Sequence, residues 1–453
     1  MLADQKKTQL SRFLGQVPDD VATNLAKAVE IDRLIGNTGL PHDEILNALR
    51  PQLKKAAAVA RTPTPQRFFC RPFEDLLVAD TRGGKRKGRI ARASIQPVWN
   101  WLGAELMPEA HAALTTGIRF AILNNRDDDV AAKCAELWSA SASAMKKALV
   151  GERAKTQAAK KLGNMGTVED AAEIAVILGA APTMLVLQEA LPRPLAALSE
   201  DYLLTLRELY DRLVASDPDA APYIAIIAMR RLAKPHEALR LAAVVSRCTA
   251  GTVIGATDLG AAGELLFDDL EALAVKIQGA RAADFEINAL LENLVAFVEL
   301  SSGIVRELGI GHDGKWGQRL GKSRSAVAAA MEALLERAPN EILAALPPQP
   351  LDLVHAPDGE CVVRAMRYAC LMAYAKPYAV AASFSAKLNE KMDETAVALR
   401  AVAEELLEAV RTPGPAPQPH AEQYFEIAAD LCAQILGPED TELLRRRARV
   451  TAA

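Results

Sequence analysis

The stretch Phe285-Glu-Ile-Asn-Ala-Leu-Leu-Glu-Asn-Leu-Val-Ala-Phe-Val-Glu-Leu300 decides the fold class of this chain. Its apolar positions recur every three or four residues, which places them along one face of an α-helix. Similar spacing recurs over much of the chain, and no convincing alternation of polar and apolar residues predicts a strand. We therefore predict an all-α fold, a multi-helix bundle or irregular helical array with a short tethered C-terminal helix.

The composition fits a large helical core. Half of the 453 residues are hydrophobic, and aromatic residues make up only 5%. Most of the apolar residues are Ala, Leu and Val, of which Ala and Leu are strong helix formers. The first seven residues, Met1-Leu-Ala-Asp-Gln-Lys-Lys7, lack the apolar run of a signal peptide, and the longest uncharged apolar stretch, 174–188, is interrupted by Gly179 and Pro182. We therefore expect neither a signal peptide nor a transmembrane segment, and a cytoplasmic location.

Proline and charge distributions suggest how the chain is organised. The predicted regions are an N-terminal helical region at 1–163 containing a basic loop at 81–93, a central helical array at 164–411 with a sub-boundary near 339–357, a proline-rich linker at 412–420 and a C-terminal helical tail at 421–453. Four prolines in nine residues favour an extended, semi-rigid linker.

Local signals predict where individual elements begin. Residues 73–78 predict a short helix before the basic loop, and Ser94 predicts a cap for a helix carrying Pro97 in its first turn. A helix is predicted over 152–162, and the sequence from Thr167 to Asp170 predicts the cap of the helix that follows it. A later helix is predicted over 325–337, after a glycine-rich loop.

One segment near the C-terminus has a narrow apolar seam. Its members are spaced four and three residues apart and are Met392, Ala396, Leu399, Ala403, Leu406 and Val410. A packed antiparallel neighbour in the same chain accounts for this spacing, and a dimerising or partner helix through 392–410 is the alternative.

The charge distribution is uneven near the N-terminal end. Residues 45–104 hold twelve Lys or Arg and three acids, a local charge of +9, so the other residues sum to −13 against a net charge of −4. The peak is Thr81-Arg-Gly-Gly-Lys-Arg-Lys-Gly-Arg-Ile-Ala-Arg92. A local field of one sign on an oppositely charged body indicates a polyanionic partner or an acidic protein surface.

Aromatic residues flank the basic loop. They are Phe68, Phe69, Phe73, Trp99 and Trp101. They could stack on nucleic-acid bases, or they could anchor the flanking helices in a core where aromatic residues are scarce. No helix-turn-helix, zinc-finger or RNP pattern supports sequence-specific reading of a nucleic acid.

A second basic segment is rich in glycine. Gly309-Ile-Gly-His-Asp-Gly-Lys-Trp-Gly-Gln-Arg-Leu-Gly-Lys-Ser323 half-matches a phosphate-binding loop, because Gly309 and Gly314-Lys315 are correctly spaced. Trp316 stands where a hydroxyl residue would hold magnesium, and a long helix precedes the loop where a strand is required. We interpret the segment as a flexible inter-helix loop that displays Trp316 as a second contact surface.

Catalytic and metal-binding patterns are not found in the sequence. The six histidines are far apart, and Asp127–Asp129 and the adjacent pair Asp268 and Asp269 lack the spacing of a magnesium site. We expect no catalytic residue, no cofactor and no metal. The predicted partner-binding residues are Arg82, Lys85, Arg86, Lys87, Arg89, Arg92, Lys315 and Trp316.

These observations favour a non-enzymatic cytoplasmic scaffold or adaptor, whose basic loop contacts a protein with an acidic surface. One alternative is a nucleic-acid-associated protein that uses the same loop. Another is an all-α enzyme with an inter-helix pocket assembled from distant residues.

Overall fold

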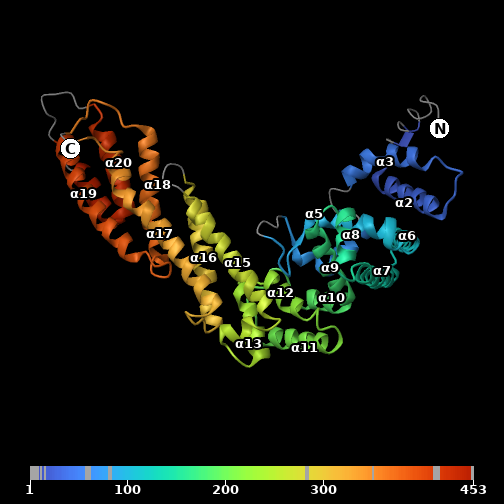
Figure 1. The fold of residues 1–453 in the computed structure, drawn as a ribbon. Coiled ribbons are helices and arrows are strands. Elements are labelled where there is room, and N and C mark those ends of the chain that lie inside the picture. Colours follow the sequence, from blue (N-terminus) through green and yellow to red (C-terminus); the bar gives the residue numbers. More distant parts are fainter. Residues whose placement is uncertain are drawn as a thin grey trace. The chain divides into compact units, whose positions relative to one another are not determined.

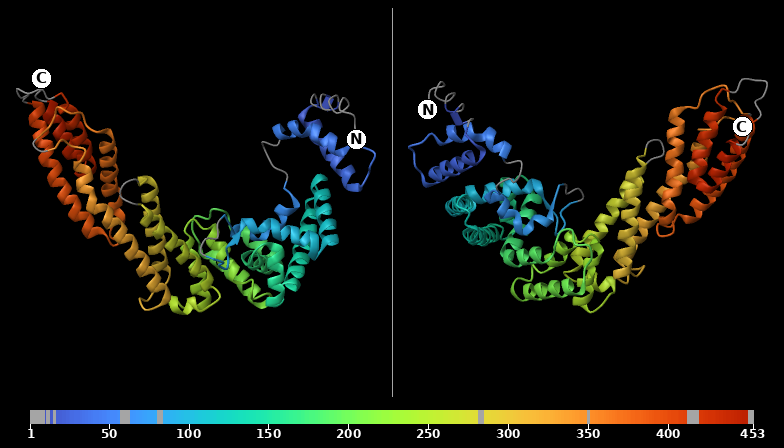
Figure 2. Two further views of the ribbon diagram at one scale, coloured as in Figure 1. Left: turned by 45° about the horizontal axis from the view of Figure 1, so that its top comes forward. Right: turned by 180° about the vertical axis from the view of Figure 1, so that it is seen from behind.

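The computed structural model describes residues 10, 13–14, 17–56, 63–79, 84–280, 285–348, 351–411 and 419–449. Regular structure within them is almost entirely helical, which confirms the predicted all-α fold (Figure 1). The chain forms two compact units, Met1–Ala233 and Lys234–Ala453, and Figure 2 shows their helices from two further directions. The predicted division at 163/164 falls inside the first unit. Most of the predicted linker, 412–418, lies outside the described residues.

The first unit contains α2 to α12. Its elements are α2 (Asp19–Ile35), α3 (His42–Ala56), α4 (Pro65–Cys70), a 3-10 helix (Arg71–Leu76), β1 (Leu77–Val78), β2 (Ile90–Ala91), α5 (Arg92–Trp101), a π-helical turn (Leu102–Leu106), α6 (Pro108–Leu123), α7 (Asp127–Ala148), α8 (Glu152–Leu162), α9 (Met165–Gly179), α10 (Ala181–Ala190), α11 (Glu200–Ser216) and α12 (Pro222–Arg231). Helices α5, α7, α8 and α10 all contact α9.

Helix α9 packs against four other helices of this unit, and most of its buried residues are apolar. Ile174, Ile177 and Leu178 are all buried. Asn164 caps the helix, and its side-chain oxygen accepts a hydrogen bond from the Thr167 amide at 2.8 Å. The predicted cap at Thr167 is therefore wrong by three residues, since Thr167 supplies the donor rather than the acceptor.

The short strands β1 and β2 close the base of the basic loop. They pair in parallel, with Leu77 opposite Ile90 and Val78 opposite Ala91. The helix predicted over 73–78 is instead the end of a 3-10 helix followed by β1. Helix α5 begins at Arg92, two residues before Ser94. Ser94 therefore lies inside the helix, and its hydroxyl binds the Asp170 carboxylate of α9 instead of capping α5. Pro97 consequently lies inside α5 rather than in its first turn.

The second unit begins with shorter helices and ends in a helical bundle. Its elements are a 3-10 helix (Pro235–Ala238), α13 (Leu239–Ser246), α14 (Gly251–Gly255), α15 (Gly260–Gly279), α16 (Ile287–Glu307), α17 (Lys315–Leu343), α18 (Gly359–Ala375), a 3-10 helix (Lys376–Tyr378), α19 (Ser385–Arg411), α20 (Ala421–Ile435) and α21 (Pro438–Arg449). Helices α17, α18, α19 and α20 pack side by side, as Figures 1 and 2 show.

The apolar seam at 392–410 lies on α19, and three of its members are fully buried. Leu399, Ala403 and Leu406 are buried in a helix that packs against α17 and α20 of the same chain. Helix α21 contacts the same bundle, with Arg445 bound to Glu426 and Asp430 of α20. Intrachain packing therefore accounts for the seam, and oligomerisation through it stays a prediction.

Helix α17 starts ten residues earlier than predicted. It begins at Lys315 rather than Ser325 and continues through Pro339 to Leu343. Glycine permits the early start, because a Cβ at Gly317 would lie only 2.0 Å from the carbonyl oxygen of Gly311. The interpretation of 315–323 as a flexible loop is therefore wrong.

Helix α16 is long and apolar enough to cross a membrane on composition alone, and the bent pair α9 and α10 passes the same test together. Leu294, Phe297 and Ile304 of α16 are buried within the protein. Core helices also pass this test, so no clear transmembrane segment stands out among the described residues.

Candidate functional site: an anchored basic loop

Two carboxylates of α9 hold the basic loop in place. Asp170 accepts hydrogen bonds from the Lys85 ammonium at 2.5 Å, the Ala91 amide at 3.1 Å and the Ser94 hydroxyl at 2.6 Å. Its side chain is only 3% exposed. Buried carboxylates need such partners, because removing a charge from water without compensation is costly.

Glu173 lies one turn further along α9 and on the same face. It pairs with Lys85 and accepts a hydrogen bond from the Gly88 amide at 2.5 Å. Gly88 has a φ of 85°, a left-handed conformation that favours glycine. The loop can therefore turn sharply enough to present its backbone to Glu173.

Tyr223 of α12 also contacts the loop, so Asp170, Glu173 and Tyr223 together form the floor on which the loop lies. Burial raises the pKa of its phenol, and the nearby Glu173 carboxylate raises it further. The Lys87 ammonium lies 5.3 Å from the centre of the Tyr223 ring. At this distance a cation is attracted to the face of an aromatic ring, so Lys87 is also partly oriented by the floor.

The predicted loop residues consequently fall into different classes. The Lys85 side chain is only 18% exposed and anchors the loop, so it is not displayed to a partner as predicted. Arg86, Lys87 and Arg92 are exposed, and Arg89 is half-buried. Arg82 lies outside the described residues.

A polar hollow of about 520 Å³ adjoins the end of the loop. Arg67 of α4 and Arg92 of α5 both line it. Glu74 supplies one opposing carboxylate. Burial raises the pKa of the adjacent Cys70 thiol to about 12, with Glu74 adding to the rise and Arg92 opposing it. The thiol therefore stays protonated, and the two guanidinium groups give the hollow its positive charge.

The second predicted site has a different geometry. Trp316 is only 4% exposed, so the expectation that it is displayed at the surface is wrong. Its indole stacks on Phe267 with ring centres 5.5 Å apart, and a Cβ at Gly263 would lie 2.5 Å from it. The indole ring therefore packs directly against the backbone of α15, at a glycine that leaves room for it.

Acids of α15 bind the cations around Trp316. Glu264 accepts hydrogen bonds from the Trp316 indole at 2.8 Å and from Lys315 at 3.0 Å. Burial favours a higher pKa for Glu264, but these bonds outweigh it and the pKa is lowered. Arg319 binds Glu264, Asp268 and Glu271 at 2.7 to 2.9 Å, and its bond to Glu271 is the largest cause of its raised pKa.

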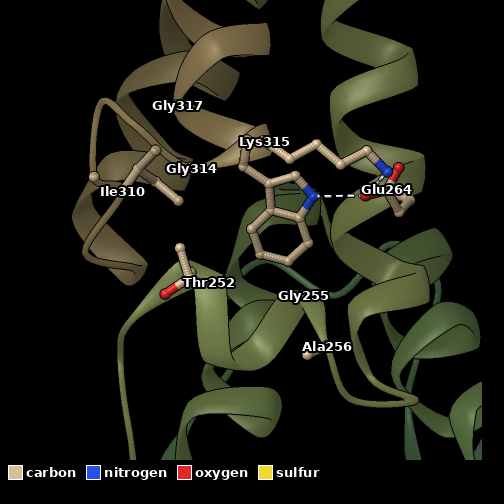
Figure 3. Close-up of a pocket in the computed structure, with 11 residues that line it drawn as sticks. Thr252, Gly255, Ala256, Glu264, Ile310, Gly314, Lys315 and Gly317 are labelled. Carbon is tan, nitrogen blue, oxygen red and sulfur yellow. Dashed lines mark hydrogen bonds and ion pairs between the residues drawn. The ribbon is translucent and has the colours of Figure 1, made fainter.

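A small pocket of about 260 Å³ lies beside this cluster. Figure 3 shows Lys315 extended toward Glu264, with Ile310 and Thr252 on the other side of the pocket. Gly309 forms an isolated bridge with Ala250 and follows α16, so no full strand precedes the glycine-rich segment. Lys315 pairs with Glu264 while its side chain stays 74% exposed. Without a preceding strand, the half-match to a phosphate-binding loop gains no support.

Sequence reasoning missed Asp170, Glu173, Tyr223 and Arg67. Asp170 and Glu173 do leave a signal, since they are two of the three acids in an otherwise largely apolar helix and lie three residues apart on one face. Tyr223 leaves none, because its contact with the loop joins residues far apart in the sequence.

Comparison with protein-family models, curated proteins and solved structures finds no match to this chain. The functional argument therefore rests on the geometry of its own residues.

Proposed function

We propose that this protein is a non-enzymatic adaptor that binds an acidic segment of a partner protein on the outer face of the anchored loop. Arg86, Lys87 and Arg92 form the contact, and Arg67 extends it into the adjoining hollow. The observation that carries this proposal is the difference in exposure among the cations of the loop. Lys85 points inward to Asp170 and Glu173, while three cations of the same loop remain exposed.

Anchoring makes such a loop a better binding element than a flexible one. A loop that is already ordered loses less conformational entropy when its partner binds. The exposed arginines also suit a carboxylate partner, because a guanidinium can bind a carboxylate through two parallel hydrogen bonds.

The burial of three of the five flanking aromatics favours a protein over a nucleic acid as the partner. Phe69 and Phe73 are fully buried and Trp101 is 7% exposed, so these rings are not available to stack on bases. Their contacts with one another and with Trp99 belong to the core of the first unit. Phe68 and Trp99 are half-buried. Nucleic-acid binding by the same loop would then depend mainly on phosphate contacts.

The enzyme alternative has less support from this site. Among the described residues, Asp170 and Glu173 are buried acids, but both bind the loop's own groups rather than face a pocket. A cytoplasmic location, where acidic protein partners are abundant, is part of the same proposal.

The test is a binding titration with a Glu/Asp-rich peptide and a single-stranded oligonucleotide of equal charge, over a salt series. The test variant carries Arg86→Ser, Lys87→Ser and Arg92→Ser. The control variant carries Lys147→Ser, Arg153→Ser and Lys160→Ser, which are exposed cations of the same unit and give the same change in net charge. Lys85 is left intact in both, since changing it would disturb the anchor.

We expect the wild type and the control variant to bind the peptide more tightly than the oligonucleotide, with binding weakened by salt. The test variant should lose about tenfold or more in peptide affinity, equivalent to about 1.4 kcal/mol. Equal losses in both variants would mean that net charge rather than the loop controls binding. Tighter binding of the oligonucleotide would support the nucleic-acid alternative instead.

A further inference from the structure

An apolar pocket of about 620 Å³ lies in the first unit among α4, α6, α7 and α10. Its volume falls within the range of small-molecule sites, roughly 300–1,000 Å³. The residues that carry the argument are Phe68, Arg71, Asp127, Cys134, Trp138 and Glu189. None of them belongs to the anchored loop, so the pocket is separate from the proposed partner contact.

The floor of the pocket is apolar. The Trp138 indole nitrogen donates a hydrogen bond to the Phe68 carbonyl oxygen at 3.1 Å, which satisfies its polar atom and leaves ring carbons toward the pocket. Burial raises the pKa of the Cys134 thiol to about 11, so this side chain is neutral. A ligand body in contact with these groups must therefore be apolar or aromatic.

Two exposed alanines of α7 keep the pocket open. Ala131 and Ala135 lie one turn apart and both line it. An alanine side chain is a single methyl group, so neither residue fills the space that a larger side chain would occupy. The opening therefore depends on residue size as well as on helix placement.

The rim carries more negative than positive charge. Asp127 and Glu189 contribute carboxylates, and Arg71 contributes the one guanidinium. Arg71 and Glu189 are 3.6 Å apart with side chains 49% and 70% exposed, so their pairing is weak and open to competition. The faces of aromatic rings also attract cations, by about 0.5–2 kcal/mol.

We propose that this pocket binds a small apolar amine, with its ring or hydrocarbon body between Phe68 and Trp138 and its ammonium group at Asp127 and Glu189. The apolar floor selects the body of the ligand, and the acidic rim selects the sign of its charge. Binding here does not depend on the adaptor function of the loop.

The test uses three probes that share one aromatic body and differ in charge: naphthylmethylamine, naphthylmethanol and naphthoic acid. Affinities are measured by calorimetric titration of the full chain at neutral pH. We expect the amine to bind most tightly, the alcohol less tightly and the acid most weakly. An acid that binds as tightly as the amine, or an amine that fails to saturate the protein, would overturn the proposal.

Two variants place the binding in this pocket. Ala135→Phe fills the opening from an exposed position, and Ala132→Phe adds the same side chain at an exposed position of α7 outside the lining. We expect the first to weaken amine binding about tenfold or more, and the second to leave it unchanged. Equal effects of both variants, with circular dichroism spectra like the wild type, would contradict the assignment.

A double variant tests the role of the rim. Asp127→Asn with Glu189→Gln removes both carboxylates from exposed positions, so the fold should be retained. We expect amine affinity to fall to that of the alcohol, while alcohol affinity stays the same. A preference for the amine that survives this change would show that the rim does not select charge.

Discussion

The basic loop of the first unit and the glycine-rich segment at the start of α17 are similar in sequence but different in structure. Both combine Lys, Arg and Gly near aromatic residues. In the loop, two acids of α9 bind Lys85 and leave Arg86, Lys87 and Arg92 exposed. At α17, acids of α15 bind Arg319, whose side chain is 16% exposed, and Trp316 is buried, whereas Lys315 pairs with Glu264 but stays 74% exposed. Acids on the neighbouring helix thus bind the partly buried cations, Lys85 and Arg319, and the remaining cations stay at the surface.

The largest expected loss of stability comes from a substitution in α17. Trp316→Ala removes a buried indole that contacts Phe267 and the glycines of α14 and α15. Truncations of buried aromatic residues cost about 3–5 kcal/mol in the free energy of unfolding. Urea denaturation would measure the loss. A loss below about 1 kcal/mol, the size of an ordinary surface change, would mean that Trp316 is not a packing residue.

A smaller loss of stability is expected from the loop anchor. Lys85→Met leaves Asp170 and Glu173 without their cation. Breaking a fully buried pair costs about 3–5 kcal/mol, and we expect about 2–3 kcal/mol because Lys85 is partly exposed. Lys87→Met, two residues away, is the matched control and should cost less than about 1 kcal/mol. Similar losses for both in chemical denaturation would contradict the distinction between anchoring and displayed cations.

The acids around Arg319 predict a dependence of stability on pH. Hydrogen bonds and charges hold the pKa of Glu264 below its ordinary value of 4.5. Its contribution is therefore fully present above pH 4.5 and is lost as the pH falls through the lower folded value. Glu264→Gln should flatten this part of the stability curve, and the exposed Glu292→Gln should not. Denaturation at closely spaced pH values would separate the two variants.

The smallest effect on stability is expected from the exposed loop cations. Arg86→Ser, Lys87→Ser and Arg92→Ser together should change the free energy of unfolding by only about 0.5 kcal/mol per site or less, as is usual for surface substitutions. The same triple variant should show the largest loss of acidic-peptide binding. A variant that unfolds would show that these residues are structural, as Lys85 is.

The sequence predicted a helix well where local signals mark both of its ends. The helix at 152–162 was expected and is observed with the same bounds, because Glu152 starts it and Gly163 ends it. The predicted helix at 325–337 was too short at its start, because the glycines before it are typical of a loop. Only the packing of Trp316 shows that they belong to α17. The predicted cap at Ser94 failed for a similar reason, since a distant carboxylate takes its hydroxyl.

The candidate site was predictable only in part. Charge distribution located the basic loop without structural information. It could not separate Lys85 from Arg86, because that depends on which residue faces α9 in three dimensions. Arg67 was counted within the basic region but not as a site residue, since only the fold brings it beside Arg92.

Amide hydrogen exchange at Gly88 and Ala91 tests the central claim most directly. If Glu173 and Asp170 hold the loop, these two amides should exchange slowly in the wild type and in the triple loop variant, and much faster in Asp170→Asn with Glu173→Gln. Exchange in the wild type at the rate of an unstructured peptide would contradict the account, because the loop would then have no anchor from which to display its cations.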